Sequence, residues 1–130
     1  MDKIIKNEYS KLTADKTFRL TAERLVLNCG IHVNLKGSEC LEDAVILYGT
    51  GACTAFCEIY RIVGLLRGIK AKTVMREISY AISHSDDIPT KLSALAGFNV
   101  TKNDIHNALV IACLGKVFRT PALSLYSATV

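Results

Sequence analysis

The fold is decided by the stretch from Tyr60 to Ile82, which reads YRIVGLLRGIKAKTVMREISYAI. Its apolar residues recur at intervals of three and four, the period of an α-helix with one buried face. Gly68 divides the stretch into two such segments, because glycine readily takes the left-handed conformation of a tight turn. Gly64 is small enough to let the second segment approach the first closely. We therefore predict a helix-turn-helix between about Tyr60 and Tyr80.

Charge within this stretch indicates a nucleic-acid partner. Residues 59–76 contain five basic side chains and no acidic one, whereas the whole chain has a net charge of only +4. Glu58 and Glu77 bound this basic window. A local cluster of Lys and Arg is typical of a surface that contacts the DNA phosphate backbone. Two positions depart from the helix-turn-helix pattern, since apolar side chains usually stand where Arg67 and Glu77 do.

The second helix of the pair, predicted from Lys70 to Ser83, is the expected DNA-reading helix. The residues that we expect on its buried face are Val74, Ile78, Ala81 and Ile82. On the outer face, Arg76 suits guanine O6 and N7, and Lys72 suits guanine or phosphate. Thr73 suits a phosphate or a thymine methyl group. The full set of candidate DNA contacts is Lys36, Arg61, Arg67, Lys70, Lys72, Thr73, Met75, Arg76, Ser79 and Tyr80.

The rest of the 130-residue chain reads as helices of one domain. Besides the pair above, we expect helices over residues 15–28, from a Ser38 cap to about Tyr48, over 90–96 and over 102–118. Residues 1–14 lack strong periodicity and are predicted to be a flexible arm, and residues 120–130 form an apolar tail of unassigned structure. The predicted fold is all-α: a compact bundle of about six helices.

Composition and cysteine usage set the expected environment. The five cysteines have no paired spacing, and the first residues lack the apolar core of a secretion signal, so we expect free thiols in the cytoplasm. The longest uncharged stretch, residues 44–57, is interrupted by glycines and too short to span a bilayer. We therefore expect no membrane association.

Other kinds of site are disfavoured. Gly49–Thr54 lacks the Gly-Lys-Ser/Thr ending of a phosphate loop. Cys53 and Cys57 have no second pair or His partner at zinc-like spacing. The three histidines are scattered along the chain, and His106 is expected on the polar side of the last helix. We expect no enzyme activity, no metal and no cofactor.

From about Ala22 to Phe118 the sequence resembles the C-terminal effector domain of the master response regulator of sporulation in endospore-forming bacteria. The similar segments are 27–31, 32–37, 42–45 with Tyr48, the predicted DNA-reading helix 70–82, and 92–101. The resemblance implies a compact helical domain that binds a short promoter element, commonly as a tandem dimer. Such a domain switches transcription, with RNA polymerase or another regulator as a further partner.

The sequence departs from this family at three places. Met75 stands where the family has Glu, and Ser79 where it has a second Arg, so base readout should be changed or weakened. Residues 49–58 are also a few positions shorter than in the family. We expect a stand-alone effector that lacks the family's phosphorylatable receiver domain. An alternative stays open: a diverged effector fold that binds another regulator and reads DNA poorly.

Overall fold

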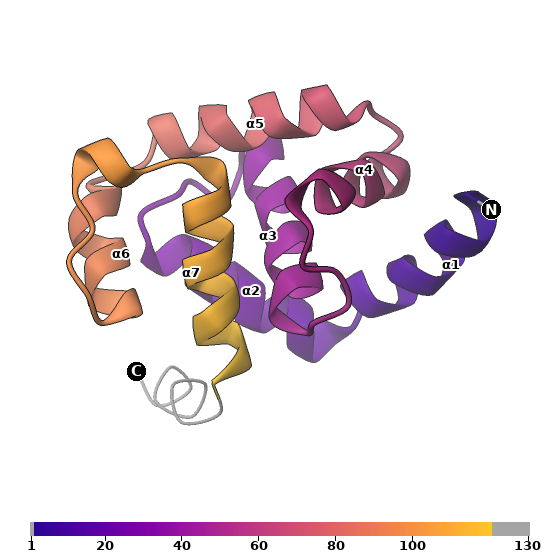
Figure 1. The fold of residues 1–130 in the computed structure, drawn as a ribbon, viewed down its shortest axis with the longest axis horizontal. Helices are drawn as coiled ribbons and strands as arrows, with labels where there is room; N and C mark the ends of the chain where they lie inside the picture. The colour runs from indigo at the N-terminus through magenta and orange to yellow at the C-terminus, as the bar shows by residue number, and fades with distance from the viewer. Residues whose placement is uncertain (1, 121–130) are drawn as a thin grey trace.

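The computed structural model of the protein describes residues 2–120 and is all-helical over that range, without a strand (Figure 1). It has seven α-helices where the sequence predicts about six. They are α1 (Asp2–Thr13), α2 (Lys16–Asn28), α3 (Lys36–Gly49), α4 (Phe56–Arg67), α5 (Ala71–Ser83), α6 (Ile88–Ala96) and α7 (Asn107–Arg119), with a 3₁₀ turn η1 (Lys102–Asp104) before α7. In the described residues no helix has the length and apolar character needed to cross a bilayer.

Helix α3 is the centre of the bundle. It packs against α2, α4, α5 and α7, and almost all of its residues are buried. A helix that is apolar on most of its circumference must be covered on all sides. Leu41, Ala44 and Val45 are fully buried in it, and Tyr48 near its end is partly buried.

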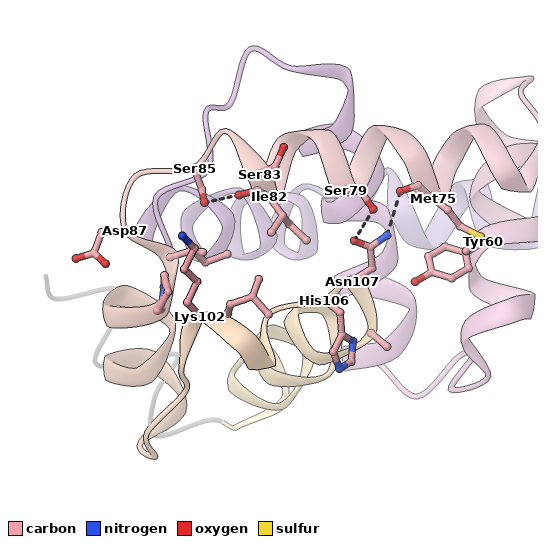
Figure 2. A pocket seen from close by; sticks show the side chains of 14 residues that line it. Tyr60, Met75, Ser79, Ile82, Ser83, Ser85, Asp87, Lys102, His106 and Asn107 are labelled. Carbon is pink, nitrogen blue, oxygen red and sulfur yellow. Dashed lines mark hydrogen bonds between the residues drawn. The ribbon is translucent and has the colours of Figure 1, made fainter.

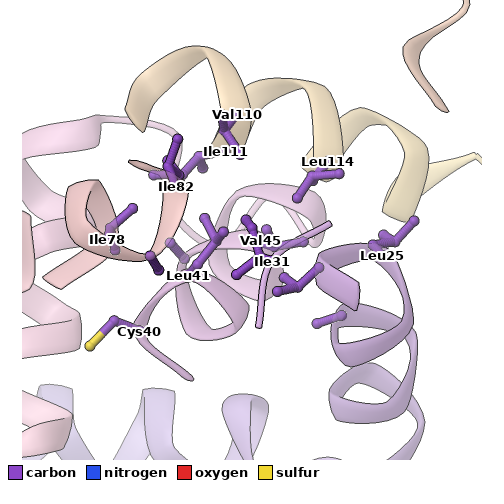
Figure 3. Close-up of a cluster of buried hydrophobic side chains, with 14 of the residues drawn as sticks. Leu25, Ile31, Cys40, Leu41, Val45, Ile78, Ile82, Val110, Ile111 and Leu114 are labelled. Atoms are coloured by element: carbon purple, nitrogen blue, oxygen red, sulfur yellow. The ribbon is translucent and has the colours of Figure 1, made fainter. Parts of the chain in front are cut away.

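The hydrophobic core joins α3 to α2, α5 and α7 (Figure 3). Its aliphatic side chains include Leu25, Leu41, Val45, Ile78, Ile111 and Leu114. All four residues expected on the buried face of α5 lie in this core. The buried face of α5 is therefore fixed against the centre of the molecule, and its opposite face is left uncovered.

Backbone contact sets the crossing of α3 and α5. At Gly37, in the first turn of α3, an added Cβ would lie 1.9 Å from the carbonyl oxygen of Glu77 in α5. Only glycine permits this approach. The beginning of α3 is thereby held directly beneath the middle of α5.

Residues 2–13 form helix α1, whereas the sequence led us to expect a flexible arm over 1–14. Tertiary contacts account for the difference: Tyr9 and Leu12 pack against the core, and Thr13 is buried. Arg19 also donates two hydrogen bonds to the Thr13 carbonyl oxygen, at 3.2 and 2.8 Å. Helical stability often comes from such packing rather than from local pattern.

Two predicted helix starts were wrong. Ser38 does not cap α3, which begins at Lys36; Ser38 lies inside the first turn and donates to the carbonyl oxygens of Val33 and Leu35. The last helix begins at Asn107 rather than at residue 102. His106 caps it, with its Nδ1 accepting from the Leu109 amide at 3.2 Å, instead of lying on a polar face. The predicted tail, apart from Thr120, lies outside the described residues.

Candidate nucleic-acid interface

A three-residue turn connects α4 to α5. Gly68 ends α4 in the left-handed conformation with φ 70°, and the Ile69 amide donates to the Gly64 carbonyl oxygen at 2.9 Å. A Cβ on Gly64 would lie 2.5 Å from the Ile69 carbonyl oxygen. The two glycines thus have the positions that the sequence assigns them, one making the turn and one permitting its close approach.

The outer face of α5 is open to solvent along its length (Figure 1). Thr73 is half-buried. The exposed candidates on this helix are Lys72, Met75, Arg76, Ser79 and Tyr80. Lys70 is exposed immediately before the helix, at its N-cap position. The helix therefore presents the predicted side chains together on one surface.

Four of the candidate cations carry charge that is not neutralised by a neighbour. Within residues 2–120, no ion pair involves Lys70, Lys72, Arg76 or Lys36. Lys36 is grouped with the α5 residues because the adjacent Gly37 packs directly against the backbone of Glu77 in α5. Glu77 itself is half-buried. We call Lys36, Lys70, Lys72 and Arg76 the basic face.

Arg67, one of the predicted DNA contacts, is paired with two acidic residues of α3. Its guanidinium binds Asp43 in α3, from Nε to Oδ2 at 2.8 Å and from Nη2 to Oδ1 at 3.0 Å. A further bond reaches Glu39 at 3.1 Å. The hydrogen bonds that Arg67 donates to Asp43 raise the pKa of Arg67 above its usual range. Arg67 therefore anchors α4 to α3, and its contact with DNA stays a prediction.

Arg61 also has an acidic partner. Its Nη2 lies 2.7 Å from Oε2 of Glu58, one turn earlier in α4. Hydrogen bonding from Arg61 lowers the pKa of Glu58. Both side chains are exposed, and solvent screens such a pair, so this contact adds little to stability.

A groove of about 880 Å³ runs beside α5, between it, α6 and the start of α7 (Figure 2). Met75 and Ser79 lie on its α5 wall. Ser79 Oγ donates to Asn107 Oδ1 at 3.0 Å, and Asn107 Nδ2 donates to the Met75 carbonyl oxygen at 3.0 Å. Ser79 is thus tied to α7. Asn107 was not a sequence candidate, because its proximity depends on a helix that lies 28 residues further along the chain.

The C-terminal end of α5 carries an aromatic pair. Tyr80 stacks on His84 with ring centroids 4.0 Å apart, and His84 Nδ1 lies 2.9 Å from the Tyr80 carbonyl oxygen. His32 and Asn34, from the loop before α3, line a small pocket with these rings. Sequence reasoning selected Tyr80 but missed its neighbours.

The cysteines are separate from this surface. Burial raises the pKa of Cys29 to about 12 and that of Cys40 to about 11, so neither thiol ionises readily at neutral pH. Cys57 is exposed. Among residues 2–120 no group of three or more His, Cys, Asp or Glu side chains is placed to hold a metal ion.

Comparison with protein-family models, with curated proteins and with solved structures finds no match to this chain. The surface that the structure assembles is therefore described by its own chemistry: an exposed helix with unneutralised cations, joined by a tight turn to a second helix.

Proposed function

We propose that the protein is a DNA-binding transcriptional regulator that uses α4 and α5 as a helix-turn-helix, with α5 as the recognition helix. The observation that carries the proposal is the basic face: Lys72 and Arg76 on the open side of α5, flanked by Lys70 and Lys36, without ion pairs to the described residues. An exposed helix of this kind fits the major groove of B-DNA.

Each cation has a role that its position supports. Arg76 reads guanine through O6 and N7, and Lys72 reads guanine or binds phosphate. Lys70, beside the turn, and Lys36, at the start of α3, contact phosphates on either side of the groove. Thr73, half-buried, is limited to a phosphate or a thymine methyl group close to the helix.

The resemblance to the sporulation effector domain supports the same function and adds detail. It favours a cytoplasmic regulator that binds a promoter element as a dimer and acts on RNA polymerase or another regulator. Base readout differs from that family's, because Met75 and Ser79 replace two charged side chains. Since Ser79 is tied to Asn107, readout is concentrated on Lys72, Thr73 and Arg76.

A second candidate is a protein-interaction module, and the groove beside α5 favours it. Its lining is mostly uncharged, with Met75, Ile82 and Ile105 among the apolar residues. A partner regulator seated there would contact the same helix without needing its cations. The two candidates therefore differ in their dependence on Lys72 and Arg76.

The test is a fluorescence-anisotropy isotherm with random-sequence duplex DNA, comparing wild type with Lys72→Glu/Arg76→Glu over a range of salt concentrations. If the basic face meets phosphates, log K should fall against log salt with a slope between about −2 and −4. The double variant should lose most of the binding. Lys16→Glu/Lys116→Glu, with the same charge change on α2 and α7, should retain more of it. Equal loss in both variants would refute a localised interface, and no wild-type binding at low salt would favour the interaction module.

A further inference from the structure

One buried carboxylate in α3 joins α2 to α4. The side chain of Asp43 in α3 is only 2% exposed and lies between two guanidinium groups. Arg67 donates to both of its oxygens, as described above, and Arg19 Nη2 donates to Oδ1. An arginine fork held by a carboxylate in this way has a fixed orientation as well as a strong attraction.

The two arginines belong to different parts of the fold. Arg67 is the last residue of α4 and adjoins the Gly68 turn. Arg19 lies in the first turn of α2 and also binds the Thr13 carbonyl oxygen, at the end of α1. Asp43 therefore connects the α4–α5 turn to the α1–α2 junction, through contacts that span 24 residues in both directions.

We propose that Asp43 is a positioning residue for DNA binding: it fixes the end of α4, and through the turn the angle of α5, against α3. The inference rests on the proposed function, because Asp43 sets the orientation of α5, the proposed recognition helix. The buried Asp43 side chain is not itself part of the basic face. Its removal leaves two guanidinium groups, partly buried, without their shared acceptor, and the turn then loses its anchor.

The decisive comparison is Asp43→Asn with Glu39→Gln. Both changes remove one negative charge from α3 and one partner of Arg67, but the Glu39 side chain is 59% exposed and Asp43 is buried. Electrostatic attraction alone makes both variants bind DNA slightly more tightly. If Asp43 positions α5, Asp43→Asn should instead bind DNA at least about tenfold more weakly. This loss of affinity is smaller than the full free-energy cost of breaking a buried ion pair. Tighter or equal binding by Asp43→Asn would overturn the proposal.

Hydrogen exchange separates positioning from general loss of stability. In Asp43→Asn, exchange of the Ile69 amide, which bonds to the Gly64 carbonyl oxygen, should accelerate at least about tenfold. The Gly97 amide caps α6 in the same left-handed geometry, at 2.9 Å from the Ser93 carbonyl oxygen, and should change much less. Val117→Ala removes core volume in α7 and serves as a control for general loss of stability. It should neither accelerate exchange of the Ile69 amide selectively nor weaken DNA binding. Uniform acceleration of both amides in Asp43→Asn would show a merely structural role and overturn the proposal.

Arg67→Lys provides the second variant if Asp43→Asn does not fold. It keeps the charge but loses the two-pronged contact, and it should show the same selective exchange and weaker DNA binding. An unchanged Ile69 amide in a folded Arg67→Lys would overturn the positioning role. If wild type binds no DNA, the proposed function fails by itself, and the Ile69 exchange still decides whether Asp43 holds the turn.

Discussion

Replacing Gly37 by alanine tests the contact that orients α5. The new Cβ would lie 1.9 Å from the Glu77 carbonyl oxygen and 2.8 Å from the Ala81 Cβ. Ordinary contact begins near 3.4 Å, so α3 and α5 would have to separate by about 1.5 Å. Because the main obstacle is backbone within a helix, no side-chain rotation can relieve it.

The size of the effect follows from two opposed contributions. Overpacking a tight core costs about 1–3 kcal/mol, and this site belongs near the upper end. Alanine gains up to about 1 kcal/mol over glycine in a helix, less so in the first turn. We expect Gly37→Ala to lower the free energy of unfolding by about 2 kcal/mol.

Urea unfolding followed by far-ultraviolet circular dichroism measures this loss. With a slope of about 1–3 kcal/mol per molar urea, the midpoint should fall by about 1 M. Lys36→Ala, at the neighbouring exposed position, should stay within about 0.5 kcal/mol of wild type. A Gly37→Ala protein as stable as Lys36→Ala would refute the close approach of α3 and α5.

Three further predictions concern titration, hydrogen bonding and thiol access. Burial raises the pKa of Glu42 to about 7 despite the opposing effect of Arg19, so the folded state holds this proton more tightly than the unfolded chain. Its contribution to stability is therefore fully present below pH 4.5 and is lost as pH rises toward 7, by up to about 3 kcal/mol. In Glu42→Gln the urea midpoint should therefore fall less between pH 4.5 and 7 than it does in wild type. A pH profile identical to that of wild type would contradict the raised pKa of Glu42. Asn107→Ala should cost about 1–2 kcal/mol in urea unfolding by breaking the bridge from α5 to α7, whereas no loss would show that solvent replaces the bridge. In native protein a thiol reagent should label exposed Cys57 rapidly and fully buried Cys29 only after unfolding; similar rates would argue against the described core.

Local pattern was sufficient where a helix has a clear apolar stripe. The spacing of Val74, Ile78 and Ala81 predicts α5 to within one residue at its start, and all three are buried. Gly68 predicts the turn because few other residues take its backbone conformation without strain. These features depend on residues near one another in the chain.

Features that depend on distant residues were not predictable in this way. Helix α1 is held by contacts with α3 and α4, which its own polar sequence does not indicate. Arg67 stands in a basic window, yet its partner Asp43 lies 24 residues earlier. The bridge from Ser79 to Asn107 likewise exists only once α7 packs against α5. A count of charges along the sequence therefore misses the acidic partners that the fold brings to some of these cations.

The most direct test of the central claim is an NMR titration of the full chain with random-sequence duplex DNA, following backbone amides at low salt. We predict the largest shifts for residues 70–80 and for Lys36 and Gly37, with little change along α2. Shifts that concentrate on another face, or no shifts at all from the folded protein, would contradict the assignment of α5 as the DNA-reading helix.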